Sequence, residues 1–222
     1  MNFAESLQQM KHRLLETGTI SSQADSLIVK SINELIASGI AEQSLKLGDV
    51  VPNFVLPNGF GQSVELQKLI ANGVVVISFF RGHWCPFCGL ELAALQKALP
   101  AIQGLGASLV AISPQTVEHT KLTVEEHEIK YEVLSDRKNN VARQFGIVFQ
   151  MPEYLRPTFQ ELGHVLPKYN GDETFELPIS ATYVISPEGR VVYAFVNPDF
   201  TKRLDPIEIV SIIRNISLGG KN

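Results

Sequence analysis

Apolar residues in most of this chain form short continuous runs that alternate with stretches of helical periodicity. The run GVVVISFF at 73–80 has no polar alternation, which is typical of a strand buried on both faces of a sheet. A second such run, ASLVAIS at 107–113, follows a segment at 85–99 whose leucines recur at helical spacing. The pattern predicts a β-α-β unit built around two buried strands.

The later part of the chain continues this alternation. A hairpin is expected at 51–66 with a turn at Asn58-Gly59, and a second hairpin turns at Pro187–Arg190. The last helix is expected to begin at Asp205 as N-cap, followed by Pro206. The other expected elements are helices at 116–130 and 139–147 and strands at 131–136, 179–186 and 190–196. This order predicts an α/β fold, with a mixed sheet that carries helices on both faces.

The first 45 residues have a different pattern. Phe3, Leu7, Met10 and Leu14 recur at helical spacing, and a second apolar stripe follows after Thr17-Gly18. We therefore predict a helical extension at 1–45 and a main domain at 46–222, with an insertion at 147–178. The apolar stripe either packs on its own domain or pairs with a second copy of the chain, which would give a homodimer.

Composition and charge narrow the function classes. Of 222 residues, 45% are hydrophobic and 19% charged, which is ordinary for a globular protein. The net charge of −4 comes without a basic cluster, so nucleic-acid binding is not expected. The N-terminus lacks the basic start and apolar stretch of a signal peptide, and no apolar run could span a bilayer. We therefore expect a cytoplasmic protein that is not bound to a membrane.

The chemistry is concentrated in the segment RGHWCPFC at 81–88, which holds both cysteines of the chain, Cys85 and Cys88. The pair follows a buried strand and opens a helix, where free N–H groups and the helix dipole favour a thiolate. The two-residue spacing lets the sulfurs close a small disulfide ring. Trp84 would shield one side of the sulfur. These features favour a redox-active pair.

Other interpretations of the pair are weaker. Inert core cysteines are not expected where a loop meets a helix. A zinc site needs four ligands. His83 is adjacent, but the chain has no second CxxC, and the other histidines show no ligand spacing. We expect no metal and no bound cofactor. His83 itself is either an ordinary loop histidine or a proton carrier.

The segment 81–88 and its surroundings resemble the peroxiredoxin-like branch of the alkyl hydroperoxide reductase and thiol-specific antioxidant family. The resemblance starts at LKLGDVVPNFVLPNGFGQSVEL and runs to the end of the chain, through VVVISFFRGHWCPFCGLEL, AISPQ, LSDRKNNVARQFGI and ATYVISPEGRVVYAFV. It implies a thioredoxin-like fold and a thiol-dependent oxidoreductase.

The family motif Pro-x-x-x-Thr-x-x-Cys, with Glu three residues later, places the attacking cysteine at Cys88 and the glutamate at Glu91. Cys85 then stands where the family has Thr, and Arg81 where it has Pro. In a thioredoxin register the roles reverse, and Cys85 attacks. Because Glu91 supports the peroxiredoxin register, the sequence favours Cys88 as the attacking cysteine.

A further position bears on the same choice. Thioredoxins place a cis-proline opposite the pair, and peroxiredoxins commonly place an Arg there. Counting back from Tyr183, this chain has Ser180 instead. We expect Ser180 to face the cysteines, with a hydroxyl able to donate to a thiolate.

The resemblance implies an antioxidant enzyme that reduces hydrogen or alkyl peroxides and closes a Cys85–Cys88 disulfide, which an external thioredoxin- or glutathione-type thiol then reduces. Two alternatives stay open. One is a thiol–disulfide oxidoreductase with little peroxidase activity. The other is a non-catalytic interaction module that docks through residues 1–45.

Overall fold

The structure is a computed structural model that describes residues 2–219. Its centre is a five-stranded sheet in the order β5-β4-β3-β8-β9. The strands are β3 (Val75–Phe79), β4 (Ser108–Ser113), β5 (Glu132–Ser135), β8 (Ser180–Ile185) and β9 (Val191–Asn197). β3 runs parallel to β4 and antiparallel to β8, so the predicted mixed sheet is confirmed.

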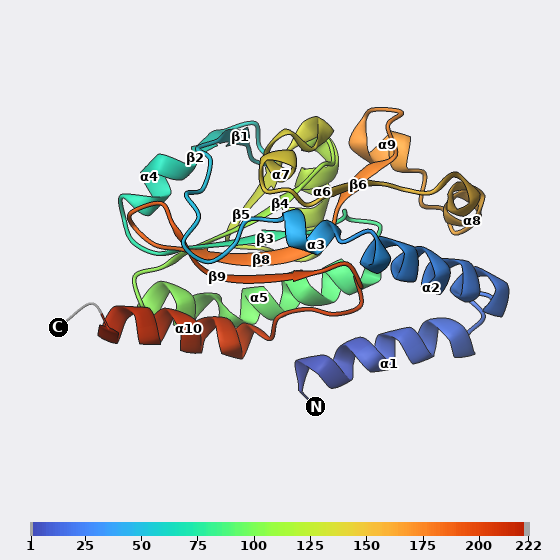
Figure 1. Ribbon diagram of the computed structural model, residues 1–222, viewed down its shortest axis with the longest axis horizontal. Helices are drawn as coiled ribbons and strands as arrows, with labels where there is room; N and C mark the ends of the chain where they lie inside the picture. The colour runs from blue at the N-terminus through green and yellow to red at the C-terminus, as the bar shows by residue number, and fades with distance from the viewer. Residues whose placement is uncertain (1, 220–222) are drawn as a thin grey trace.

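Helices cover both faces of this sheet. In Figure 1, α5 and α10 lie together on one side of it, while α4 and α7 lie on the other. The bounds are α4 (Leu66–Ile70), α5 (Pro86–Gly104), α6 (Val117–Glu126), α7 (Asn140–Gln144) and α10 (Pro206–Gly219). β3 is fully buried between the two layers, as its continuous apolar run predicts. The α5 helix begins a few residues after β3, so the buried strand leads directly to the cysteine pair.

The N-terminal helices pack against the rest of the same chain. They are α1 (Phe3–Glu16), α2 (Ser22–Ala37) and α3 (Ile40–Gln43). In α1, Leu7 is buried, and Phe3, Met10 and Leu14 pack against the cluster that includes α5. The apolar stripe is thus covered within one copy of the chain and does not by itself require a second one. Dimerisation stays a prediction.

Residues 147–178 form a small structured segment beside the sheet. It contains β6 (Val148–Gln150), the 3-10 turn η2 (Glu153–Leu155), α8 (Arg156–Glu161), α9 (Leu166–Asn170) and β7 (Glu176–Pro178). Outside it, β1 (Val55–Pro57) pairs with β2 (Ser63–Glu65), and the 3-10 turn η1 spans Arg137–Asn139. β6 and β7 pair with each other and form no ladder with the central sheet.

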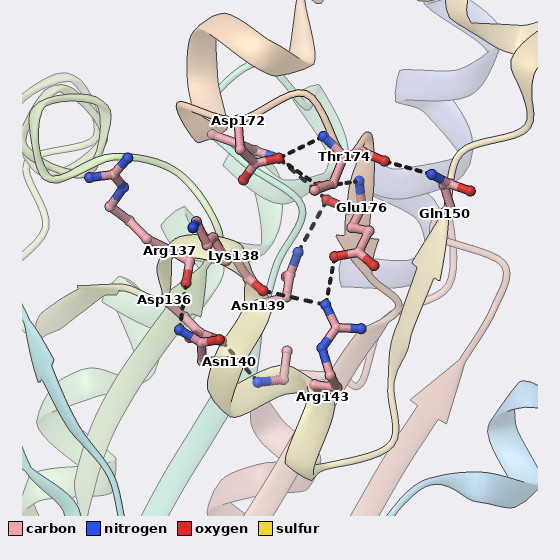
Figure 2. Close-up of polar contacts among 12 residues, drawn as sticks. Asp136, Arg137, Lys138, Asn139, Asn140, Arg143, Gln150, Asp172, Thr174 and Glu176 are labelled. Carbon is pink, nitrogen blue, oxygen red and sulfur yellow. Dashed lines mark hydrogen bonds and ion pairs between the residues drawn. The ribbon is translucent and has the colours of Figure 1, made fainter.

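Polar contacts hold this segment in place on two sides. Figure 2 shows Arg143 of α7 paired with Glu176, with 2.6 Å between Nη2 and Oε2, and Asn139 donating to the Glu176 carbonyl at 3.2 Å. On the other side, the Tyr154 hydroxyl donates to Glu34 of α2 at 2.6 Å. The segment and the N-terminal helices are therefore linked to each other. The division of the chain into an extension at 1–45 and a main domain at 46–222 stays a prediction.

Candidate active site

Cys85 is the N-cap of α5. Its backbone is extended (φ −92°, ψ 112°), and its Sγ accepts a hydrogen bond from the Cys88 amide at 3.4 Å. A sulfur thus takes the place of the oxygen that usually caps a helix, with Pro86 in the first turn, where a missing N–H costs nothing. The amide and the helix dipole both favour negative charge on this sulfur. The predicted position of Cys85, at the start of a helix after a central strand, is confirmed.

Arg81 supplies a positive charge to Cys85. Its Nη2 lies 3.1 Å from the Cys85 Sγ. The guanidinium lies 3.5 Å from the centre of the Phe200 ring and 4.9 Å from the Trp84 ring, so two aromatic side chains hold it. Gly82 makes this packing possible, because its φ of +151° disfavours other residues and a Cβ would lie 2.6 Å from the Trp84 Nε1.

A second arginine reaches Cys88. The Arg203 Nη2 lies 3.5 Å from the Cys88 Sγ, and its Nε donates to Glu91 at 2.7 Å. The Arg203 and Glu91 side chains are 1% and 3% exposed, so this ion pair is essentially buried. Ser78 of β3 also donates to Glu91, at 3.3 Å. Two sulfurs and two guanidinium groups are therefore enclosed together at the start of α5.

These surroundings shift the pKa values of the two thiols in opposite directions. Burial alone would raise the pKa of Cys85, but the hydrogen bond from Cys88 and the charges of Arg81 and Arg203 outweigh it and lower that pKa well below its usual value. Burial, the hydrogen bond to Cys85 and the negative charge on Cys85 raise the pKa of Cys88 well above its usual value. The surroundings therefore favour the thiolate at Cys85 and the thiol at Cys88.

The other residues predicted for the site differ in how they relate to the two cysteines. Trp84 lies beside the pair and packs edge-on against Phe159, with ring centres 5.6 Å apart. His83 turns toward α6, where its Nε2 lies 3.3 Å from Glu126, and no hydrogen bond joins it to either sulfur. Ser180 is buried beside Arg81, but its hydroxyl has no hydrogen-bond partner. Ser180 therefore does not donate to a thiolate in this structure, and its position facing the cysteine pair stays a prediction.

Sequence reasoning missed Arg203 and Phe200, which follow β9 and come more than 110 residues after the cysteines. It also missed Gln115, which accepts a hydrogen bond from the His83 amide at 2.9 Å and so fixes the loop before Cys85. One signal for Arg203 was present. A glutamate on the buried side of α5 requires a cationic partner, although the sequence does not say which one.

Glu91 makes a pH-dependent contribution to stability. Burial raises the pKa of Glu91 to about 7 against the opposing charge of Arg203, so between about pH 4.5 and 7 the folded chain holds a proton that the unfolded chain has released. The free energy of unfolding should therefore fall by roughly 3 kcal/mol as the pH rises through that window. We expect Glu91→Gln to remove this slope in urea unfolding measured at several pH values. Equal slopes in the two proteins would contradict this assignment.

Comparisons with known proteins identify the family of this chain. Residues 47–194 match the model of the AhpC/TSA family. The chain belongs to the AhpC/TSA family. This confirms the family that the motifs at 81–88 indicated, and the match includes both cysteines, Arg81 and Glu91, but ends before Arg203.

The curated proteins that this chain is similar to include two kinds of thiol protein. Peroxiredoxin Bcp of Escherichia coli is 28% identical over 103 residues, which cover 46% of this chain and 65% of that protein, slightly under two thirds. The thiol-disulfide oxidoreductase ResA of Bacillus thuringiensis is 24% identical over 136 residues, covering 61% of this chain and 76% of the relative. The names thus point to peroxide and disulfide chemistry respectively.

Among solved structures, peroxidoxin BcpB from Mycobacterium tuberculosis superposes with a TM-score of 0.61 at 23% identity, over 78% of this chain and 98% of that one. This likeness confirms the thioredoxin-like fold. Within residues 2–219, no helix is long and apolar enough to cross a membrane.

Proposed function

We propose that this chain is a thiol-dependent peroxidase of the peroxiredoxin type, with Cys85 as the attacking thiolate. One observation carries the proposal: both sulfurs are 0% exposed, yet Cys85 is surrounded by groups that stabilise a thiolate. A buried thiolate is out of reach of a folded disulfide substrate, whereas a peroxide is small enough to enter. Membership of the AhpC/TSA family and the peroxiredoxin relatives support the same chemistry.

The proposed reaction has two steps. The Cys85 thiolate attacks the outer oxygen of the peroxide, the S–O bond forms as the O–O bond breaks, and the sulfur becomes a sulfenic acid. The departing alkoxide or hydroxide takes the proton that Cys88 holds. The Cys88 thiolate then attacks the sulfenic sulfur, closes the Cys85–Cys88 disulfide and releases hydroxide. Arg81 and Arg203 stabilise the negative charge that moves between these atoms.

Regeneration requires an outside reductant, because the chain has two cysteines and the disulfide uses both. We propose an external dithiol of the thioredoxin type or glutathione. A reducing cytoplasm would supply such thiols. Structural disulfides are rare in that compartment, so a closely spaced pair there is better explained as redox-active. No bound cofactor takes part in the proposed steps.

The choice of Cys85 departs from the family register, which favours Cys88. Arg203 and Glu91 lie beside Cys88, as a peroxiredoxin-type site would require. Arg81 and the helix amide lie nearer to Cys85, at 3.1 and 3.4 Å from its sulfur, and the raised pKa of Cys88 favours its thiol form. We give the electrostatic argument more weight, because a thiolate rather than a thiol is the nucleophile.

The second candidate function is thiol–disulfide exchange. It is favoured by the segment Trp84-Cys85-Pro86, which follows the thioredoxin register, and by the relative named thiol-disulfide oxidoreductase. Exchange with a protein disulfide would require the start of α5 to open, because neither sulfur is exposed.

Two assays on the reduced protein separate these functions. Trp84 is the only tryptophan and lies beside Cys85, so its fluorescence should report oxidation in a stopped-flow instrument. We expect fast, second-order oxidation by peroxide and little reduction of insulin disulfides. The reverse result would favour the oxidoreductase. A double Cys85→Ser, Cys88→Ser variant that keeps its cellular function would favour an interaction module instead.

A further inference from the structure

Arg81 is held beside Cys85 without a carboxylate partner. Its side chain is 5% exposed, its Nη2 lies 3.1 Å from the Cys85 Sγ, and its Nε–H has no acceptor. Within residues 2–219, no ion pair and no other side-chain hydrogen bond fixes this guanidinium. A buried arginine ordinarily requires an acidic partner. Polar contacts other than the one to the sulfur therefore do not explain why Arg81 stays in place.

Aromatic rings take the place of that partner. The centre of the Phe200 ring lies 3.5 Å from the guanidinium carbon of Arg81, closer than the centre of the Trp84 ring at 4.9 Å. A ring contacts the face of a planar guanidinium, so the N–H groups at its edge stay free to donate. A carboxylate would occupy that edge and oppose the charge, as Glu91 does for Arg203 at 2.7 Å. Phe200 thus holds a cation whose charge remains available to the sulfur.

The N-terminal helices support Phe200 in turn. The connection from β9 to α10, which carries Phe200, turns back beside α1 and α2 (Figure 1). Phe200 lines a cavity of about 30 Å³ together with Leu14 and Ile28, and its ring centre lies 5.5 Å from that of Phe87. A cavity this small leaves the facing side chains close together. Leu14, Ile28 and Phe200 all lie outside the family match at 47–194, so this support belongs to the present chain.

We propose that Phe200 is a positioning residue that holds the Arg81 guanidinium against the Cys85 sulfur, and that the N-terminal helices serve this role by supporting Phe200. The inference rests on one part of the proposed function, namely that Cys85 acts as a thiolate. Burial raises the pKa of Cys85, and the hydrogen bond from Cys88 opposes this effect. The charges of Arg81 and Arg203 lower the same pKa, and the contribution of Arg81 depends on where its guanidinium is held.

A titration of the thiolate by ultraviolet absorbance in the reduced protein tests the proposal. Phe200→Leu keeps an apolar side chain but removes the ring, so the midpoint of the titration should rise by at least about 0.5 pH unit. Phe200→Tyr keeps the ring and should titrate like the wild type. Phe195→Leu is the matched control, because Phe195 of β9 is also half-buried but has no contact with a cation within the described residues.

Double variants separate positioning from a merely structural effect. Arg81→Met should itself raise the midpoint by about one pH unit or more, because the cation nearest to the sulfur is lost. In that background, Phe200→Leu should leave the midpoint unchanged, because no cation is left to position. An equal rise from Phe200→Leu in both backgrounds, or no rise in either, would overturn the proposal.

The same titration extends to the N-terminal helices. Ile28 is 7% exposed and lines the cavity beside Phe200, whereas Ile36 of the same helix is 53% exposed. We expect Ile28→Ala to raise the midpoint by less than Phe200→Leu does, and Ile36→Ala to leave it unchanged. Leu14→Ala takes the place of Ile28→Ala if that variant does not fold. Equal midpoints in all of these variants would overturn the role of the N-terminal helices.

None of these measurements uses peroxide, which keeps this inference separate from the proposed function. A protein that showed the expected titrations but did not react with peroxide would overturn the proposed function and leave the positioning role of Phe200 standing. A protein that reacted with peroxide but titrated identically with and without the Phe200 ring would overturn the positioning role alone.

Discussion

Replacing Cys85 with serine is expected to abolish the reaction with peroxide, whereas Cys88→Ser should keep the first oxidation and stop at a sulfenic acid. The first variant removes the only thiolate of the pair, and serine is not ionised near neutral pH, so the rate should fall at least about 1,000-fold. The second variant removes the thiol that resolves the intermediate. A dimedone-type probe after addition of an equimolar amount of peroxide, read by mass spectrometry, distinguishes the two.

The Cys88→Ser variant and the opposite trapping result both bear on which cysteine attacks. Cys88→Ser replaces the thiol that donates to the Cys85 thiolate with a hydroxyl, which can also donate, so the pKa of Cys85 should stay low and the first oxidation should still proceed. Trapping of sulfenic acid in Cys85→Ser and not in Cys88→Ser would show that the family register, with Cys88 as attacker, is correct and that our electrostatic argument is wrong.

The second large effect is expected at Arg203. Arg203→Met leaves Glu91 buried without its partner, and loss of one member of a buried ion pair costs about 3–5 kcal/mol of unfolding free energy. We expect a value near the lower end, because Glu91 can take up a proton. The thiolate also loses one of its two cations, so the pKa of Cys85 should rise and peroxide oxidation at neutral pH should slow at least about tenfold.

A double variant separates the structural effect from the electrostatic one. Arg203→Met with Glu91→Gln has no unpaired buried charge, so much of the stability should return in urea unfolding. The thiolate absorbance should still titrate at a higher pH than in the wild type, because the cation is still missing. If the double variant regained both stability and peroxide reactivity, Arg203 would be a structural residue only.

The strands of the core were predictable because their signal is local. The run at 73–80 has no polar residue until Ser78, and a segment buried on both faces can show no alternation, so the sequence identifies β3 directly. The fate of the α1 stripe was not predictable. An apolar helix face is the same in sequence whether it covers its own domain or a second chain, and the contact between Leu7 and the α5 cluster decides it.

In the site too, the residues that are close in sequence were predictable and those brought in by packing were not. Cys85, Trp84 and Arg81 lie within five residues of one another, and the strand-to-helix context identifies their neighbourhood. The cation beside Cys88 could not be predicted, because Arg203 lies in a connection whose path depends on the packing of β9 and α10. Ser180 illustrates the converse. Its place in the sheet followed from counting along β8, but the direction of its hydroxyl depends on which neighbours already satisfy the sulfur.

The packing of the N-terminal helices also affects how the chain is made. α1 and α2 are synthesised before their partners, which include α5, Tyr154 of η2 and Phe200. At about 5–20 residues per second, roughly 10–40 s pass between the synthesis of Phe3 and that of Phe200. Until then the stripe of Phe3, Leu7, Met10 and Leu14 lacks part of the surface that covers it in the folded chain. The packing of the N-terminal helices can therefore be completed only after the residues that follow β9 have been synthesised.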